Sequence, residues 1–182
     1  ADLSVETHNV LVTVPGGGER AWLGGSDGTD NGVWRWVTGP VGKEDKGRGR
    51  VFFTGTFDNN PTCILQQCFW SGGEPNDWHP PSSPWLGEKF LMVLGGTVRW
   101  NDLGAHGHND SKWTKHWYCE YPEDPETAVA EIHPLRLFSR ANSGGISWYE
   151  ARQICTIYNS SLAIEIDMKS HMILDQLGAS LP

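Results

Sequence analysis

The chain has 182 residues, enough for one well-buried domain, and its net charge of −8 argues against nucleic acid and anionic membrane surfaces, because both need a basic face. It contains 22 glycines, 11 prolines and 10 tryptophans, and it never approaches 18 consecutive apolar residues. We therefore expect many turns, few helices and no membrane insertion.

Short strands separated by turns are expected over the first 57 residues. A β-branched run at 10–14 ends at a proline followed by three glycines. Further strand candidates follow at 21–23, 33–37 and 50–54. Trp22, Trp34 and Trp36 are expected in the core, because tryptophan buries a large apolar area. The mixed-charge cluster at 43–50 is expected to be a solvated loop.

Residues 70–102 carry most of the polar chemistry. Three carboxylates and two carboxamides stand there among glycines, prolines and tryptophans: Glu74, Asn76, Glu88, Asn101 and Asp102. Oxygen ligands suit a hard cation such as Ca²⁺, which accepts six to eight oxygens in a flexible geometry. Zinc would prefer nitrogen or sulfur, and this stretch supplies only His79. The competing interpretation is an ordinary polar surface loop.

A return to strands follows this stretch. Candidates lie at 89–94, 99–102 and 113–121, with a polar loop at 103–112 between the last two. The Pro/Glu-rich sequence that begins at Pro122 has the composition of a linker, which we place at 123–134.

Helical signals appear only after that linker. Following a strand candidate at 135–138, Ser147 and Glu150 form the N-cap and third position of a capping box. A strand candidate at 161–166 leads into a second helix, in which apolar residues recur at helical spacing: Met168, Met172, Ile173 and Leu177.

The four cysteines, Cys63, Cys68, Cys119 and Cys155, are an even number without a paired Cys-x-x-Cys zinc pattern. Cys63 and Cys68 are close enough in sequence for a small local disulfide. A zinc site made by these two with His106 and His108 is the alternative. Disulfides would indicate an oxidising compartment, so we expect a secreted or extracellular protein, with an ectodomain as one form.

Several motifs in this order resemble the C-type lectin-like domain. They are Ala21-Trp22-Leu23-Gly24, Val33-Trp34-Arg35-Trp36, Glu74-Pro75-Asn76, Glu88, Trp100-Asn101-Asp102 and Tyr118-Cys119-Glu120-Tyr121. The resemblance covers most of residues 20–122. Residues 135–182, with an opening strand, a Trp-x-x-Ala-x-x-x-Cys helix, a Ser-Leu-Ala strand and a second helix, resemble the family's first half, yet here they come last. The chain is thus either a circular permutant or a cut through a tandem array.

The resemblance implies an α+β fold with two helices packed on small antiparallel sheets and a long irregular calcium-binding loop. As a permutant, residues 1–182 would form one domain, with the sheet and binding half at 1–122 and the opening strand and helices at 135–182. It also implies a disulfide between Cys119 and Cys155, and a cis bond before Pro75. Asp77 matches a ligand of the family's auxiliary calcium site, but Lys89 stands where another acid would be.

The resemblance further implies a calcium-dependent lectin. Ca²⁺ would be held by the five residues Glu74, Asn76, Glu88, Asn101 and Asp102, and sugar by Glu74, Asn76, Glu88, Asn101 and the ring of Trp78. The Glu-Pro-Asn order goes with mannose, glucose, fucose and N-acetylglucosamine in the family. The alternative is a lectin-like scaffold that binds a protein or another surface with calcium only structural. No triad spacing suggests an enzyme, and we expect a monomer or a domain-swapped dimer.

Overall fold

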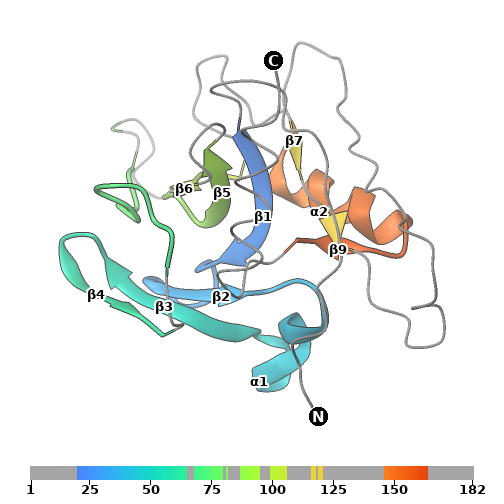
Figure 1. Cartoon of the computed structure of the whole chain (residues 1–182), viewed down its shortest axis with the longest axis horizontal. Helices are drawn as coiled ribbons and strands as arrows, with labels where there is room; N and C mark the ends of the chain where they lie inside the picture. Colours follow the sequence, from blue (N-terminus) through green and yellow to red (C-terminus); the bar gives the residue numbers. More distant parts are fainter. Residues whose placement is uncertain are drawn as a thin grey trace.

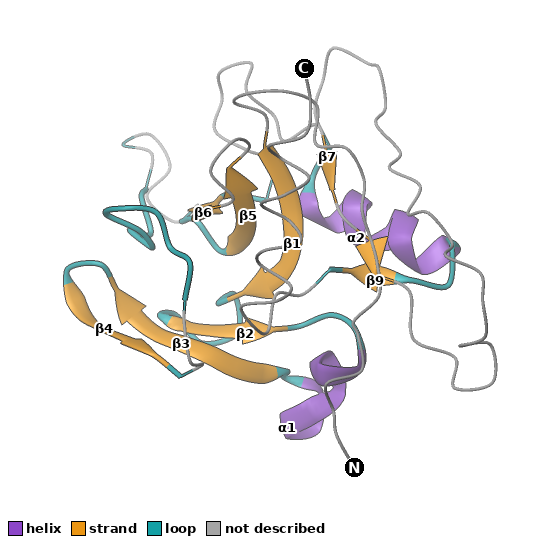
Figure 2. Cartoon of the chain, viewed as in Figure 1, coloured by secondary structure: helices purple, strands orange, loops and turns teal. Residues whose placement is uncertain are grey.

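The computed structural model describes residues 20–64, 68–79, 81, 87–94, 99–105, 116–117, 119–120 and 146–163. Within them the chain is α+β, mostly a curled antiparallel sheet with two short helices (Figures 1 and 2). The expected strands at 10–14 and 135–138, the linker at 123–134 and the expected second helix lie outside the described residues.

The main sheet is built around β1 (Arg20–Ser26), in the strand order β4-β3-β2-β1-β5-β6. On one edge of β1 lie β2 (Val33–Trp36), β3 (Arg50–Thr56) and β4 (Asn59–Cys63), and on the other β5 (Phe90–Leu94) and β6 (Arg99–Leu103). A short β7 (His116–Trp117) pairs with β1 in parallel. A separate pair consists of β8 (Cys119–Glu120) and β9 (Ser161–Leu162).

Five strand predictions are confirmed: those at 21–23, 33–37, 50–54, 89–94 and 99–102 coincide with β1, β2, β3, β5 and β6. Strand β4 was missed, because it contains Pro61 and every one of its residues is exposed. Proline is tolerated at a sheet edge, where its missing N–H breaks no ladder bond, and β4 is the edge strand.

The cluster at 43–50 is not the plain loop that we expected. It contains the end of η1 (Pro40–Lys43) and the short turn α1 (Glu44–Gly47), in which Asp45 and Lys46 have positive φ angles of 47° and 61°. Arg48 pairs with Asp45 at 2.7 Å, and Arg50 pairs with Glu44. These ion pairs are exposed, so they contribute little to stability.

Tryptophan and phenylalanine rings form the core beneath the sheet. Trp22, Trp34 and Trp36 are at most 1% exposed, which confirms the prediction for them. Phe52 stacks on Trp36 with ring centroids 4.2 Å apart and meets Trp100 edge-on at 5.5 Å. Burying such rings supplies a large share of the stability of a small β-rich domain.

The predicted capping box is present at the start of α2 (Trp148–Ile157). The Glu150 amide donates to the Ser147 hydroxyl at 3.2 Å, and the Ser147 amide donates to the Glu150 carboxylate at 3.0 Å. Trp148, Ala151 and Cys155 form the buried face of the helix.

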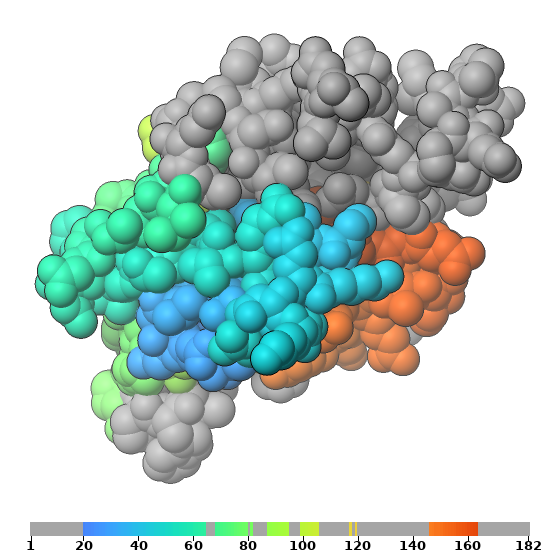
Figure 3. Space-filling view, turned by 90° about the horizontal axis from the view of Figure 1, so that it is seen from below, coloured from blue at the N-terminus to red at the C-terminus, as the bar shows by residue number. Residues whose placement is uncertain are grey.

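The C-terminal described segment packs on β1 (Figure 1), and Figure 3 shows it in orange beside the cyan stretch near residue 40. The indole N–H of Trp148 donates to the Leu23 carbonyl at 2.8 Å, and that of Trp22 donates to the Ile146 carbonyl at 2.8 Å. The Thr38 hydroxyl donates to the Leu162 carbonyl at 2.7 Å. These bonds join residues more than 120 positions apart in sequence, so the segment completes the main sheet's core.

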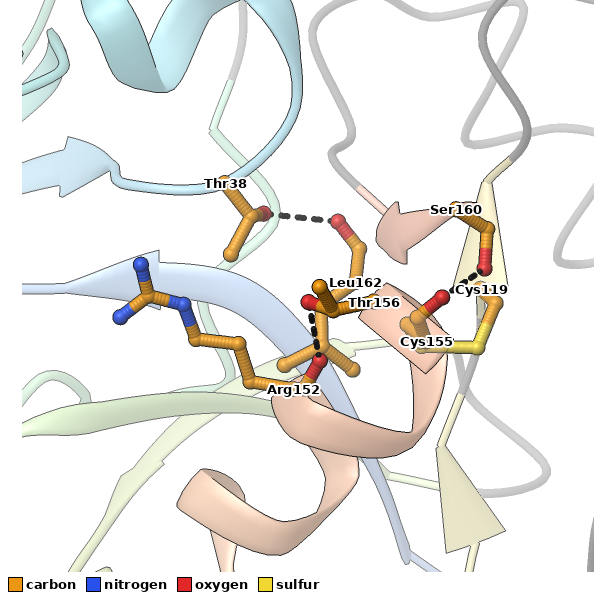
Figure 4. The surroundings of a disulfide bond; sticks show 7 residues. All are labelled: Thr38, Cys119, Arg152, Cys155, Thr156, Ser160 and Leu162. Carbon is orange, nitrogen blue, oxygen red and sulfur yellow. Dashed lines mark hydrogen bonds between the residues drawn. A yellow bond between two sulfur atoms is a disulfide. The ribbon is translucent and has the colours of Figure 1, made fainter. Parts of the chain in front are cut away.

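Both expected disulfides are formed. Cys63 bonds Cys68 and Cys119 bonds Cys155, with Cα atoms 5.8 Å and 5.5 Å apart. The second joins β8 to α2, beside the hydroxyl bond of Ser160 to the Cys155 carbonyl (Figure 4). The alternative zinc site is therefore wrong, because its thiols are consumed. The disulfides fit an oxidising compartment. Over the described ranges, no helix combines the length and apolar character needed to cross a membrane.

Candidate functional site

Backbone hydrogen bonds hold the loop that carries Glu74 on two sides. At its start, the Ser71 amide donates to the Trp100 carbonyl at 2.8 Å, which aligns the loop with β6. At its tip, the Phe57 amide in the β3–β4 turn donates to the Pro75 carbonyl at 2.8 Å. The loop thus lies between the β3–β4 hairpin and β6 (Figure 1). The Glu74–Pro75 peptide is cis, as the resemblance implied.

Two buried carboxylates fix the main chain that follows Pro75. Asp102 accepts hydrogen bonds from the amides of Asn76 at 3.2 Å and Asp77 at 2.7 Å. Glu88 accepts one from the amide of Trp78 at 3.3 Å. The strand register explains why both acids reach the loop, since Asp102 lies opposite Leu91 in the β5–β6 pair and Glu88 lies two residues before β5. Segments far apart in sequence therefore meet at one place.

The five predicted metal ligands differ in exposure. Asp102 and Glu88 are buried, Glu74 and Asn101 are partly buried, and Asn76 is exposed. The Asn101 amide group donates to the Asp102 carbonyl. Glu74 and Asp102 share a side-chain hydrogen bond, and the charges of Glu74 and Asp102 both act on Glu88. The structure brings the three acids into one neighbourhood with Asn76 at its open side.

The electrostatics of this neighbourhood are unfavourable for free carboxylates. Burial raises the pKa of Glu88 to about 8, and the negative charge of Asp102 adds to that rise. Burial also raises the pKa of Glu74 to about 8, and the hydrogen bond of Glu74 with Asp102 is the second cause of that rise. The pKa of Asp102 itself is raised by burial, although backbone amides oppose the shift. Groups that resist ionisation for these reasons are typical of functional sites.

The side chains present fit a calcium ion in their chemistry. One oxygen of Glu74, Oε2, is buried without a hydrogen-bond partner, which leaves an acceptor for a cation. Carboxylate and carboxamide oxygens are the donors that calcium prefers. Among the described residues, no three side chains of His, Cys, Asp or Glu form a metal-binding group on their own. The resemblance adds the amide oxygens of Asn76 and Asn101 to the expected ligand set.

Trp78 lies at the solvent side of the same loop. Its side chain is 46% exposed, while its amide is fixed by Glu88. An indole half-open to solvent and anchored through its backbone can stack on an apolar face of a ligand. His79 is also exposed, and its imidazole lies 3.4 Å from the Asp77 carboxylate.

Sequence reasoning missed a group of residues beside the predicted ligands. Lys89 pairs with Asp77 at 2.8 Å, bonds Asn31 and lies 3.8 Å from Asp27. Asp27 is 2% exposed, and burial raises its pKa to about 6. The sequence signals were Asp77, which matches an auxiliary calcium ligand in the resemblance, and Lys89, at a position where the resemblance implied an acid. Asn31 and Asp27 carried none, because they lie about 60 residues away in the chain.

Comparison with protein-family models, with curated proteins and with solved structures gives no match to this chain.

Proposed function

We propose that the chain is a calcium-dependent carbohydrate-binding protein with a C-type lectin-like architecture, acting in recognition or adhesion. Its preferred ligands would be terminal mannose, glucose, fucose or N-acetylglucosamine residues. Ca²⁺ would be held by Glu74, Asn76, Glu88, Asn101 and Asp102. The proposal concerns a secreted or extracellular protein.

The single observation that carries the proposal is the meeting of Glu74, Glu88 and Asp102 around one loop, with a buried Glu74 oxygen left unpartnered. Three like charges at a partly buried place are costly unless a cation balances them. A divalent ion with flexible coordination resolves both the charge excess and the missing partner.

The chemistry of Glu74 and Asn76 supports sugar recognition. A carboxylate only accepts hydrogen bonds, whereas an asparagine NH₂ group donates them, so the pair offers an ordered acceptor and donor. Bound calcium would supply coordination for two vicinal hydroxyls. Asn76 is exposed, which leaves one side of the loop open to a ligand. The order Glu then Asn favours hydroxyl pairs of the mannose and glucose type, as the resemblance implies.

The test is a glycan array read with calcium and with excess EDTA. We expect binding to mannose- or fucose-terminated glycans that EDTA abolishes and Ca²⁺ restores, while Mg²⁺ restores it poorly because its small octahedral shell resists such ligands. Glu74→Gln should lose this binding. Glu44→Gln, which changes an exposed acid on α1, is the matched control and should keep it. Glycan binding unchanged in EDTA overturns the proposal.

The scaffold alternative is favoured by one observation: Asp102 and Glu88 already hold the backbone of residues 76–78. Calcium among them could therefore serve only to fix the loop. In that case calcium would raise the melting temperature, yet no glycan would bind with or without it. Thermal denaturation run beside the array separates the two functions.

A further inference from the structure

The Lys89 side chain is held in a defined position beside the loop that carries Glu74 and Asp77. Its ammonium group lies 2.8 Å from Oδ1 of Asp77 and 3.8 Å from Oδ2 of Asp27, and it donates to the side-chain oxygen of Asn31. The lysine side chain is 25% exposed, against 12% for Asp77 and 2% for Asp27. Lys89 is thus partly withdrawn from solvent and faces two more deeply buried carboxylates.

Hydrogen bonds to the Lys89 main chain fix the position of this residue as well. The Ser26 hydroxyl donates to the Lys89 carbonyl at 2.7 Å, and the Asp27 amide donates to it at 3.3 Å. The carboxylate of Asp27 accepts the Gly32 amide at 2.8 Å. These bonds tie the end of β1 to the residue before β5, so the lysine stem starts from a rigid place.

Asp77 connects Lys89 to the candidate calcium ligands. Its backbone has φ 47°, in the left-handed region that aspartate enters more readily than most non-glycine residues. From that conformation its amide donates to Asp102 at 2.7 Å, next to the amide of Asn76. The opposite wall is also close, because a Cβ on Gly87 would lie 2.4 Å from the Asp77 carboxylate.

We propose that Lys89 is a positioning residue for calcium: its ammonium acts as a tethered cation that holds Asp77, and through it the amides bound to Asp102. This inference rests on the proposed function. It makes a prediction of sign. Removing a nearby positive charge would, by Coulomb attraction alone, strengthen binding of Ca²⁺. Losing the support for Asp77 would weaken it, because the ligand loop would no longer be held for the ion.

Calorimetric titration of the whole chain with CaCl₂ separates these effects. We expect Lys89→Met to weaken calcium binding about tenfold, the cost typical of losing an outer-shell partner. Lys89→Arg, which keeps the charge and the donors, should stay within about threefold of the wild type. Lys43→Met, at an exposed lysine at the end of η1, is the control and should leave the affinity unchanged.

A double-mutant cycle tests the route through Asp77. Asp77→Asn should weaken calcium binding, and Lys89→Met added to it should cost little more, because both changes break one contact. Additive losses would show that Lys89 acts elsewhere. Circular dichroism and melting in EDTA confirm that each variant is folded. If Lys89→Met does not fold, Lys89→Arg and Asp77→Asn decide, and unchanged affinity in Asp77→Asn overturns the inference.

The outcomes also separate the two proposals. If the wild type shows no heat of calcium binding, the proposed function fails, and this inference fails with it. If the wild type binds Ca²⁺ and Lys89→Met binds it equally or more tightly, only the positioning role is wrong.

Discussion

The aromatic core and the carboxylates Asp102 and Glu88 are both buried, but their burial has opposite energetic consequences. In the core, the ring centroids of Trp36, Phe52 and Trp100 lie 4.2–5.8 Å apart, and the three rings lose water together. Beneath the loop that carries Glu74, Asp102 and Glu88 lose water beside other acids, with 0% and 4% exposure. The core contacts are favourable as they stand, whereas the buried acids call for a compensating charge.

The difference indicates which part of the molecule depends on a ligand. Burial of a large apolar side chain contributes about 1.5–3 kcal/mol of stability without any partner outside the chain. Burial of a carboxylate oxygen costs free energy unless it is bonded or paired, and Oε2 of Glu74 has no hydrogen-bond partner. We therefore expect the sheet to form without calcium, and the loop to reach its lowest free energy only with a cation bound.

The largest expected effect on stability comes from removing a ring from the aromatic core. Phe52→Ala should lower the free energy of unfolding by about 3–5 kcal/mol, because the ring is fully buried among other aromatic rings. Phe57→Ala, on the exposed turn at the end of the same strand, is the matched control and should cost less than about 1 kcal/mol. Urea denaturation measures both. Calcium should not restore Phe52→Ala, and an equal loss in the two variants would refute the assignment of the core.

The next effect concerns the two disulfides. Replacing both Cys119 and Cys155 by serine should cost about 4 kcal/mol and replacing Cys63 and Cys68 about 2 kcal/mol, on the loop-entropy account of cross-links. The reason is loop length, since the pairs enclose separations of 36 and 5 residues. Thermal unfolding of the two variants gives the order. A larger loss from the Cys63–Cys68 pair would contradict it.

Non-reducing electrophoresis of the wild-type protein, which retains the Cys119–Cys155 bond, tests whether the chain closes on itself. The Cys119–Cys155 bond leaves a monomer if the C-terminal segment packs on its own sheet, and a covalent dimer if that segment is exchanged between two chains. We favour the monomer, because 35 residues between the two cysteines are ample for closure within one chain.

Local signals carried the correct sequence predictions. The capping box of Ser147 and Glu150 lies within four residues and needs no tertiary information. The β-rich runs and the buried tryptophans follow from residue type alone. Strand β4 was missed because Pro61 and polar neighbours give no periodic pattern, and only pairing with β3 reveals it.

The candidate site was predictable in part for the same reason. Its five oxygen-bearing residues stand in one recognisable stretch, but their setting depends on contacts across the fold. Lys89 meets Asn31 at a separation of 58 residues, and the Asp102 bonds to the loop span 25 and 26. Side-chain pairings over such distances leave no local mark in a single sequence.

A smaller effect tests the cost of burying an acid, through the pH dependence that Asp27 gives to stability. Asp27 faces the Gly32 amide and the charges of Lys89, Asp77 and Asp102, and burial raises its pKa from 3.8 to about 6. A raised pKa means that the folded state favours the protonated acid, so its stabilising contribution is complete below pH 3.8 and is lost as pH rises through about 6. The stability of the wild type relative to Asp27→Asn should therefore fall by roughly 2 kcal/mol over that range in EDTA.

The measurement is a series of urea titrations of both proteins from pH 3.5 to pH 7. Subtracting the variant cancels the acids that the two proteins share. Asp30→Asn, at a half-exposed acid near the same turn, serves as the control. A difference that stays flat across the range would mean that Asp27 is not held in an environment hostile to its charge.

The smallest effect concerns ligand contact without metal contact. Trp78 exposes 46% of its surface while its amide is bound to Glu88. The indole can therefore be removed without removing the backbone hydrogen bond to Glu88. If the indole stacks on the sugar, Trp78→Ala should weaken glycan binding about fivefold, equivalent to about 1 kcal/mol, and leave the calcium affinity unchanged. Tyr149→Ala, at an exposed aromatic residue on α2, should change neither. Calcium titration and glycan competition on the same samples separate the contributions. A parallel loss of both affinities would place Trp78 in the support of the metal loop rather than in the sugar platform.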